Sequence, residues 1–266
     1  MLENEINAEV NKYHWYHTIK LTGDITTPGW EVVIPTVNLI CKCMTRVDFK
    51  DKSVLDVGCR DGLMSFEAER LGAREVIAID NDLSPGATEF LIPFFHSSVK
   101  MLEMNLYDLR PETFGMFDVI IFPGVLYHLR YPFWGLKLLR DLLHPGGVMI
   151  VETAVRIENE EDAILYCPVG HESPYEPSSC TFFNRKGLVD TLRSLGLESI
   201  HVDTKDGTQP RQTPQKQPQP RGIEQLDRLV VTCRFNPEIL DKQAIKYWDG
   251  MHDIHSAYFH PWEKNS

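Results

Sequence analysis

Residues 54–62, Val-Leu-Asp-Val-Gly-Cys-Arg-Asp-Gly, combine acidic residues and glycines in a spacing that suits the binding of a nucleoside. An apolar run ends at Gly58, which can adopt backbone angles that a side chain penalises and lets the main chain approach a ligand. Asp61 is a good N-cap for a helix over residues 62–71, whose free N–H groups would face a bound anion. A second apolar run ends at Asp80, about twenty residues beyond the glycine turn, where a carboxylate can reach ribose hydroxyls.

A second group of reactive side chains, Tyr127 and His128, follows the apolar run 117–122. His128 could act as a general base, because the unperturbed pKa of histidine lies near neutrality. Tyr127 could orient a substrate. Each has a structural alternative, since His128 could cap a backbone group and Tyr127 could pack in the core. Glu152, at the end of a later apolar run, could be a base, a substrate anchor or one half of an ion pair.

The elements that must position these residues alternate between strands and helices from residue 53 to residue 153. Such alternation predicts an α/β fold, a mostly parallel seven-stranded sheet with helices on both faces. We expect strands near 53–57, 75–79, 98–104, 117–122, 147–153, 198–202 and 229–234, and helices near 62–72, 84–95, 108–114, 132–144 and 185–195. Ligands of such sheets bind beyond the carboxyl ends of the strands, so the candidate residues should gather at one edge.

The glycine turn carries a family resemblance. A full G-x-G-x-x-G is missing, because Arg60 stands where the second glycine of a dinucleotide-binding turn would be. The stretch Asp56-Val-Gly58-Cys-Arg-Asp-Gly62 instead resembles motif I of the class I S-adenosylmethionine (SAM) dependent methyltransferases. The resemblance implies a Rossmann-like fold and SAM as cofactor. It also implies that Asp56 holds the methionine amino group through water or turn contacts, that Gly58 lies under the cofactor and that Asp80 binds the ribose.

The same resemblance gives adenine-binding roles to Asn105 and Leu106, which follow the third strand. Asn105 would hydrogen-bond the exocyclic amine and Leu106 would offer its backbone N–H, although Asn105 could equally be a helix cap or turn residue. Three N-terminal aromatic residues, Trp15, Tyr16 and Trp30, could form a lid over the sulfonium of SAM, because aromatic faces stabilise desolvated cations. They could equally well cover the hydrophobic core.

The sequence resembles one branch of this superfamily more closely than the others. Residues 122–130, Phe-Pro-Gly-Val-Leu-Tyr-His-Leu-Arg, and residues 143–153 are similar to the tRNA wobble-uridine carboxymethyltransferases, which use carboxy-SAM. The resemblance runs from about residue 17 to residue 202 and implies that Tyr127 helps to bind the carboxylated cofactor. The extra carboxylate needs a cationic partner. The candidate cations are Arg60, Arg130, Arg156 and Arg221.

Composition favours a different acceptor from that of the tRNA enzymes. The net charge of the 266 residues is −11, which gives no overall field that attracts nucleic acid. Only about fifty residues precede motif I, too few for a further domain. We therefore expect a SAM-dependent methyltransferase with a small-molecule acceptor, and a nucleic-acid partner to be unlikely. Intramolecular cyclisation of SAM with release of methylthioadenosine, transfer from carboxy-SAM to tRNA wobble uridine, and non-catalytic SAM binding stay open as alternatives.

The domain organisation follows from the same patterns. We expect residues 1–50 to form a helical and aromatic lid, and residues 51–235 to form the SAM-binding domain. Within it, the stretch 204–221, rich in proline and glutamine, predicts a disordered loop. The stretch 154–183 should wall the acceptor site, with Tyr166, His171, Tyr175 and Phe182 as candidate lining. Residues 236–266 should form a helical extension that packs on the core or on a second subunit of a homodimer.

Several classes of protein are disfavoured. The six cysteines form no C-x-x-C pair, so a zinc ribbon or a disulfide scaffold is not expected. The histidines His252, His255 and His260 could suggest a metal, but no metal site is predicted because such sites need more ligands in a fixed frame. The N-terminus does not resemble a signal peptide, and no apolar stretch approaches the length of a membrane span. A cytoplasmic location without membrane contact is expected.

Overall fold

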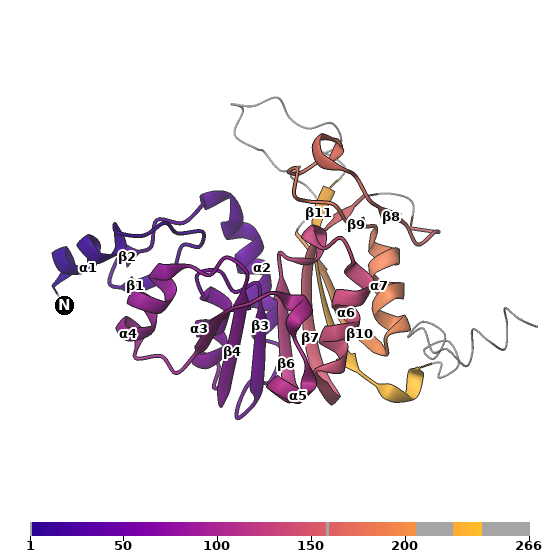
Figure 1. Cartoon of the computed structure of the whole chain (residues 1–266), viewed down its shortest axis with the longest axis horizontal. Helices are drawn as coiled ribbons and strands as arrows, with labels where there is room; N and C mark the ends of the chain where they lie inside the picture. Colours follow the sequence, from indigo (N-terminus) through magenta and orange to yellow (C-terminus); the bar gives the residue numbers. More distant parts are fainter. Residues whose placement is uncertain (1, 158–159, 206–225, 241–266) are drawn as a thin grey trace, which may run out of the picture.

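The fold is built around a seven-stranded sheet (Figure 1). The computed structural model describes residues 2–157, 160–205 and 226–240. The strand order is β10-β11-β7-β6-β3-β4-β5. The parallel pairs are β3 with β4 and β6, β4 with β5, and β6 with β7, whereas β11 is antiparallel to both β7 and β10. The prediction of a mostly parallel seven-stranded sheet is therefore confirmed.

The strands of this sheet match the apolar runs of the sequence. They are β3 (Ser53–Val57), β4 (Glu75–Asp80), β5 (Lys100–Glu103), β6 (Phe117–Pro123), β7 (Leu143–Arg156), β10 (Leu197–Thr204) and β11 (Leu226–Phe235). Two small hairpins lie outside the sheet, β1 (Lys20–Thr22) with β2 (Ile25–Thr26) and β8 (Leu165–Tyr166) with β9 (Phe182–Phe183).

The helices lie close to their predicted positions. The α-helices are α1 (Glu3–Val10), α2 (Ile34–Met44), α3 (Leu63–Arg70), α4 (Ile92–Phe95), α5 (Pro111–Phe114), α6 (Pro132–Asp141) and α7 (Arg185–Ser194). A π-helical stretch, Ala87–Leu91, leads into α4, and short 3-10 helices occur at Glu31–Val33, Leu106–Asp108, Leu126–His128, Gly170–Glu172 and Pro237–Ile239.

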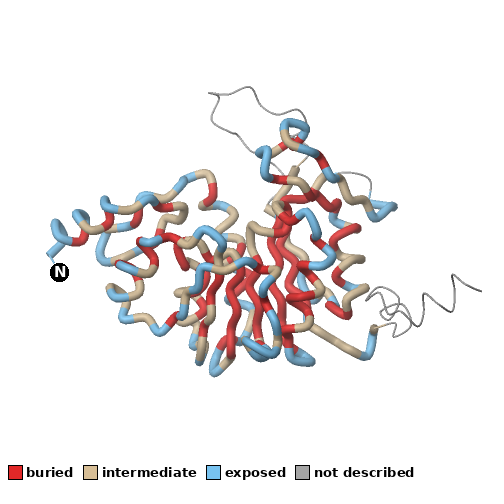
Figure 2. Tube along the Cα trace, in the orientation of Figure 1, coloured by how far each residue is buried: buried red, intermediate tan, exposed pale blue. Residues whose placement is uncertain are grey.

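Two hydrophobic layers form because successive strand residues point to opposite faces of the sheet. On one face Leu55 packs with Leu136 of α6 and Leu188 of α7. On the other face Val54 packs with Met44 of α2 and with residues of α3. The central strands are buried along their length, as expected for a sheet covered on both faces (Figure 2).

The predictions for the two ends of the chain and for the proline-rich loop need comment. α2 packs over the interior strands β7 and β11, and its residues Cys43 and Met44 are part of the hydrophobic layer there. The predicted lid at residues 1–50 begins with α1 and the β1–β2 hairpin, which lie to one side of the sheet in Figure 1. The predicted disordered loop lies outside the described residues from residue 206 on, and so does the predicted C-terminal extension from residue 241 on, with its three histidines.

Candidate functional site

A cavity of about 1240 Å³ lies at the carboxyl ends of the parallel strands. The glycine turn after β3, the end of β4 and the loops after β5 and β6 contribute to its wall, together with the N-terminal segment, the stretch before β9 and the start of β11. Its charged and aromatic lining residues are Tyr16, His17, Trp30, Glu31, Arg60, Asp80, Asp82, Tyr107, Tyr127, His128, Arg130, Glu152, Tyr175, Glu176 and Arg228. Most of the candidate residues therefore meet at the predicted edge.

The turn after β3 leaves no room for a side chain at Gly58. This residue has φ +83°, and an added Cβ would lie 2.1 Å from Cγ2 of Val125. The Gly58 N–H donates to the carbonyl of Ile79 at 2.8 Å, which ties the turn to β4. The bare main chain at this point lines the cavity, and its place under the cofactor stays a prediction.

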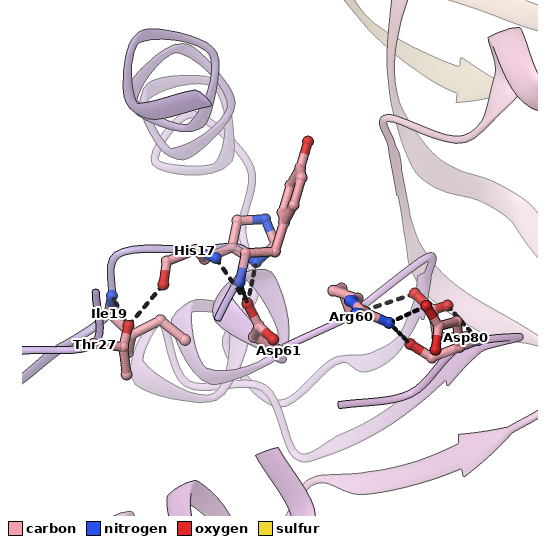
Figure 3. Close-up of polar contacts among 8 residues, drawn as sticks. His17, Ile19, Thr27, Arg60, Asp61 and Asp80 are labelled. Atoms are coloured by element: carbon pink, nitrogen blue, oxygen red, sulfur yellow. Dashed lines mark hydrogen bonds and ion pairs between the residues drawn. The ribbon is translucent and has the colours of Figure 1, made fainter. Parts of the chain in front are cut away.

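Asp80 is held in a fixed orientation at the end of β4. Its Oδ2 accepts the N–H of Arg60 at 2.8 Å and its Oδ1 accepts the N–H of Asp82 at 2.8 Å (Figure 3). Burial raises the pKa of Asp80 above its ordinary value, although these hydrogen bonds oppose the shift. Arg60 also forms an ion pair with Asp82. The carboxylate lines the cavity, and its ribose-binding role stays a prediction.

Asp61 does not cap α3, contrary to the sequence-based expectation. The N-cap of α3 is Gly62. The buried Asp61 carboxylate instead accepts the backbone N–H groups of Tyr16 at 2.6 Å and His17 at 2.7 Å (Figure 3). Burial opposes ionisation, but the hydrogen bonds from His17 and Tyr16 lower the pKa of Asp61 below its usual value. Asp61 thus fastens the N-terminal segment to the glycine turn.

The N-terminal segment is closely fitted where it crosses the cavity. The Trp30 N–H donates to the Tyr16 carbonyl at 3.0 Å, and the two rings lie 5.3 Å apart. Thr27 Oγ1 bridges this segment internally, donating to the His17 carbonyl at 2.6 Å and accepting the Ile19 N–H at 2.7 Å (Figure 3). Both Tyr16 and Trp30 line the cavity, and Trp30 is 61% exposed. This position favours the lid interpretation for Trp30, since a core residue would be covered. Trp15 does not line the cavity and is buried in a hydrophobic cluster with Phe90, which is its core alternative.

Asp56 lies behind the cavity wall. Its side chain is fully buried, and Oδ2 accepts the Ser65 hydroxyl at 2.6 Å. Burial raises the pKa of Asp56 to about 7. Asp56 is not among the lining residues, because β3 directs Val57 and Gly58 to the cavity while Asp56 faces α3. Direct contact with a methionine amino group does not fit this placement, and a contact through water or through the turn stays a prediction.

Asn105 and Leu106 line the cavity between β5 and α5. Asn105 caps the short helix Leu106–Asp108, because its Oδ1 accepts the Tyr107 N–H at 2.9 Å. The alternative role of Asn105 as a helix cap is therefore present in the structure. Its adenine-binding role, and that of Leu106, stay predictions.

Tyr127 and His128 line the cavity next to each other, with ring centroids 4.3 Å apart. Tyr127 is buried and stacks on Phe182 at 6.4 Å, and burial raises its pKa. His128 Nε2 lies 3.4 Å from Glu176 Oε1, and burial lowers the pKa of His128 although Glu176 opposes the shift. A neutral imidazole facing a cavity can accept a proton. The predicted catalytic roles of both residues stay predictions.

Arg228, which the sequence analysis missed, lies against Tyr127. Its guanidinium carbon is 4.9 Å from the Tyr127 ring centroid, and Nη1 donates to the Tyr175 hydroxyl at 3.2 Å. Nε and Nη2 donate to Glu152 at 2.6 and 2.7 Å, so Glu152 forms the ion pair that was one of its alternatives. The strand order could have indicated Arg228. Because β11 is antiparallel to β7, the start of β11 lies at the same edge of the sheet as the carboxyl ends of the parallel strands.

Some of the other candidate cations and loop residues line the cavity, and others lie outside it. Arg60 and Arg130 line the cavity, Arg156 does not and stacks over Tyr166 instead, and Arg221 lies outside the described residues. In the stretch expected to wall the acceptor site, Tyr175 lines the cavity. The other three named residues do not, since they lie on the β8–β9 hairpin or on the exposed 3-10 helix at 170–172: Tyr166, His171 and Phe182.

Within the described part of the chain, no cluster of three or more histidine, cysteine or acidic side chains is arranged to hold a metal ion. In the same residues, no helix has the length and apolarity that crossing a membrane requires.

The sheet order, the glycine turn and the acidic residue at the end of β4 define a Rossmann-like nucleoside-binding protein of the class I methyltransferase type. A family model described as a methyltransferase domain matches residues 38–202. The chain therefore belongs to the methyltransferase domain family. The predictions of the class I fold, of a SAM-dependent methyltransferase and of SAM as its cofactor are confirmed at the level of this family.

Curated relatives cover the same core. A tRNA U34 carboxymethyltransferase of Cellvibrio japonicus (strain Ueda107) is 32% identical over 203 residues, which are 71% of this chain and 56% of that protein. One of Helicobacter pylori (strain Shi470) is 35% identical over 162 residues, which are 58% of this chain and 59% of that protein. The chain thus spans little more than half the length of these relatives. Among solved structures, the N-terminal domain of EvdMO1 with SAH bound has a TM-score of 0.64 at 15% identity, covering 89% of this chain and 98% of that chain, which shows the shared fold.

These relatives overturn two expectations. The preference for a small-molecule acceptor is wrong, and so is the expectation that a nucleic-acid partner is unlikely, because the matched relatives are named as tRNA-modifying enzymes. Net charge was a poor guide because it sums the whole surface and does not show where the charges lie.

Proposed function

We propose that this protein transfers a carboxymethyl group to the wobble uridine of tRNA, with carboxy-SAM as the donor. The observation that carries the proposal is the identity of 32–35% to proteins named for that reaction. Such an enzyme acts in the cytoplasm, where tRNA is modified. Because the chain spans only part of those relatives, its activity has to be tested on this chain itself.

The cavity suits a nucleoside cofactor and an acceptor base together. Its volume of about 1240 Å³ exceeds the roughly 300–1,000 Å³ typical of a site for one drug-sized ligand. The turn at Gly58 leaves a bare main chain where a Cβ would clash, and Asp80 presents an oriented carboxylate for ribose hydroxyls. When bound, carboxy-SAM supplies an activated carboxymethyl group on a sulfonium. These residues fit the nucleoside part of that donor.

Arg228 and its two tyrosine neighbours suit the extra carboxylate of the donor. Arg228 donates to the Tyr175 hydroxyl and lies over the Tyr127 ring, and all three residues line the cavity. Arginine N–H groups and tyrosine hydroxyls are both hydrogen-bond donors to carboxylates. Glu152 fixes the guanidinium plane through two hydrogen bonds. We assign the carboxylate of the donor to this group, and His128 to the removal of a proton from the acceptor.

The direct test is incubation of the protein with tRNA from a strain that lacks this modification, with carboxy-SAM or SAM, followed by mass spectrometry of the nucleosides. The expected result is a wobble uridine whose mass has increased by one carboxymethyl group, only with carboxy-SAM. Methyl transfer from SAM to another acceptor would contradict the proposal. So would release of methylthioadenosine from SAM alone, which would indicate self-cyclisation.

Tyr127→Phe tests the carboxylate-binding role without removing the ring. Loss of a hydrogen bond to a charged group should weaken carboxy-SAM binding roughly tenfold or more. Binding of SAM should change little, and calorimetry with both cofactors measures the ratio. An equal loss for both cofactors would contradict the role. Tyr166→Phe is the matched control, since Tyr166 does not line the cavity.

A further inference from the structure

Three aromatic side chains at the start of α6 are exposed, although aromatic rings are usually at least partly covered. The exposed fractions are 68% for Tyr131, 53% for Phe133 and 49% for Trp134. The buried face of α6 is provided by other residues, among them Leu136 and Leu139. Phe133 also packs edge-on against the buried Phe183, with ring centroids 5.8 Å apart, so one of the three rings has a part in packing. The burial of α6 does not explain the aromatic rings of Tyr131 and Trp134.

This aromatic patch, residues 131, 133 and 134, is continuous with the rim of the cavity. The two preceding residues, Leu129 and Arg130, line the cavity. Tyr107, another lining residue, packs edge-on against Tyr131 with ring centroids 6.4 Å apart, and its hydroxyl donates to the Tyr131 carbonyl at 3.3 Å. A substrate that enters the cavity on this side passes the patch.

Cationic groups lie beside the rings. Lys137 Nζ is 5.5 Å from the Trp134 ring centroid and is also paired with Asp141 at 2.6 Å. Arg130 is exposed, and among the described residues no ion pair is recorded for it. Aromatic rings interleaved with Lys and Arg are the surface on which unpaired bases stack while their phosphates are neutralised. An apolar protein partner would not need this cation at the rim.

We propose that Tyr131, Phe133 and Trp134, with Arg130 beside them, form a stacking platform for the unpaired nucleotides that flank the target uridine. The proposal rests on the proposed function and names the part of the protein that holds the RNA. An enzyme that modifies a base takes it out of the stack into its pocket, and the flanking nucleotides are then held at the pocket rim. The platform occupies that rim.

The test measures binding of the full chain, saturated with SAH, to a fluorescent anticodon stem-loop RNA. Trp134→Leu keeps apolar area but loses the flat ring, and it should weaken binding roughly tenfold. Trp134→Phe should retain most of the affinity. Ile200→Ala is the matched control, because Ile200 is an exposed apolar residue on β10, outside the cavity. Melting temperatures confirm folding, and calorimetry with SAH should give the same affinity for all variants.

Two results would overturn the proposal. One is unchanged RNA affinity of Trp134→Leu and of Tyr131→Leu, or no RNA binding by the unaltered protein. The other is a dimer, seen by analytical ultracentrifugation without RNA, that both substitutions dissociate, since the patch would then be a protein interface. Failure of the proposed function is a separate outcome. If no carboxymethyl uridine forms but the Trp134 variants still alter RNA binding, the platform stands and the assigned reaction falls.

Discussion

Both the backbone conformation and the packing of the cavity wall require a residue without a side chain at Gly58. Its φ of +83° disfavours a side chain, and the position of a Cβ is occupied by Val125 Cγ2 at 2.1 Å. Gly58→Ala should destabilise the protein by roughly 2–5 kcal/mol, from left-handed strain plus overpacking, and cofactor binding should be lost with the displaced turn. Urea unfolding and calorimetry with SAH measure the two effects.

Gly146→Ala separates strain from clash. Gly146 has a similar φ of +81°, but nothing lies within 4 Å of its added Cβ. This variant should lose only about 1–3 kcal/mol, the cost of the backbone strain alone, and should bind SAH normally. If Gly58→Ala were no more harmful than Gly146→Ala, the close approach at the turn would not matter.

Asp56 predicts a pH dependence of stability. Burial raises its pKa from 3.8 to about 7, so between these pH values the native state holds a proton that the unfolded state has released. The free energy of unfolding should therefore fall as pH rises through this window and level off above pH 7. Asp56→Asn cannot ionise and should gain stability over the unaltered protein by up to about 4 kcal/mol at pH 8. Urea unfolding at pH 5, 6, 7 and 8 measures the difference.

Asp118→Asn provides the opposite case. Although partial burial opposes ionisation, hydrogen bonds from Ser53 lower the pKa of Asp118, so its stabilisation is complete above its ordinary pKa and is lost only in acid. Its variant should be less stable than the unaltered protein by the same amount from pH 5 to pH 8. A difference for Asp56→Asn that did not grow with pH would contradict the role of its buried carboxylate.

The residues that sequence could identify are those whose role is local. Gly58 and Asp80 follow directly from a strand, a turn and a spacing, and the structure places both in the cavity wall. Asp61 and Arg228 were misassigned or missed because their partners lie 45 residues or more away in sequence, at Tyr16 and Glu152. Only the fold brings these pairs together.

At the scale of elements, the alternating pattern of the sequence identified every strand of the main sheet. The central strands are covered on both faces and must be apolar along their length, whereas the edge strand β5 is largely exposed and was located by its place in the alternation of strands and helices. The sequence pattern did not show which strands α2 covers. An amphipathic pattern predicts that one face of a helix is buried, but it does not identify the element on which that face packs. The extra reach of β7 to Arg156 and the β8–β9 hairpin were also missed. Both depend on pairing with segments distant in sequence.

Attachment of the N-terminal segment through Asp61 gives a prediction at this scale. Asp61→Ala removes the acceptor of the Tyr16 and His17 N–H groups. The segment carrying Trp30 should then detach from the glycine turn, and hydrogen exchange of peptides covering residues 11–30 should accelerate. Affinity for SAH should fall roughly tenfold, since hydrogen bonds to a buried charge are lost. Exchange mass spectrometry and calorimetry give the two measurements.

Asp24→Ala is the control, because Asp24 lies exposed between β1 and β2 of the same segment. It should leave both exchange and affinity unchanged. If Asp61→Ala weakened SAH binding without faster exchange at residues 11–30, Asp61 would act directly on the cofactor rather than through the segment.

At the scale of the whole molecule, the summed charge says little about RNA binding, whereas the charges at the cavity can be compared one by one. The net charge of −11 does not show where the charges lie on the surface. The cavity lining carries charges of both signs, with Glu31, Asp80, Asp82, Glu152 and Glu176 set against Arg60, Arg130 and Arg228. If this chain binds tRNA as proposed, few cations at the cavity are available for phosphates, and stacking should supply much of the binding, in contrast to the usual electrostatic mode.

This balance predicts a weak salt dependence of RNA binding. With about two phosphates neutralised in a single-stranded loop, a rise from 50 to 200 mM salt should weaken binding by less than about tenfold, against the 10³ or more of broad phosphate binders. Arg130→Gln should flatten the slope further by losing one contact, whereas Arg193→Gln, exposed on α7 outside the cavity lining, should not. Fluorescence anisotropy over this salt range measures the slopes. A steep slope that Arg130→Gln leaves unchanged would mean that the RNA is held by charges elsewhere on the chain, because each cation that contacts a phosphate contributes its own share of the slope.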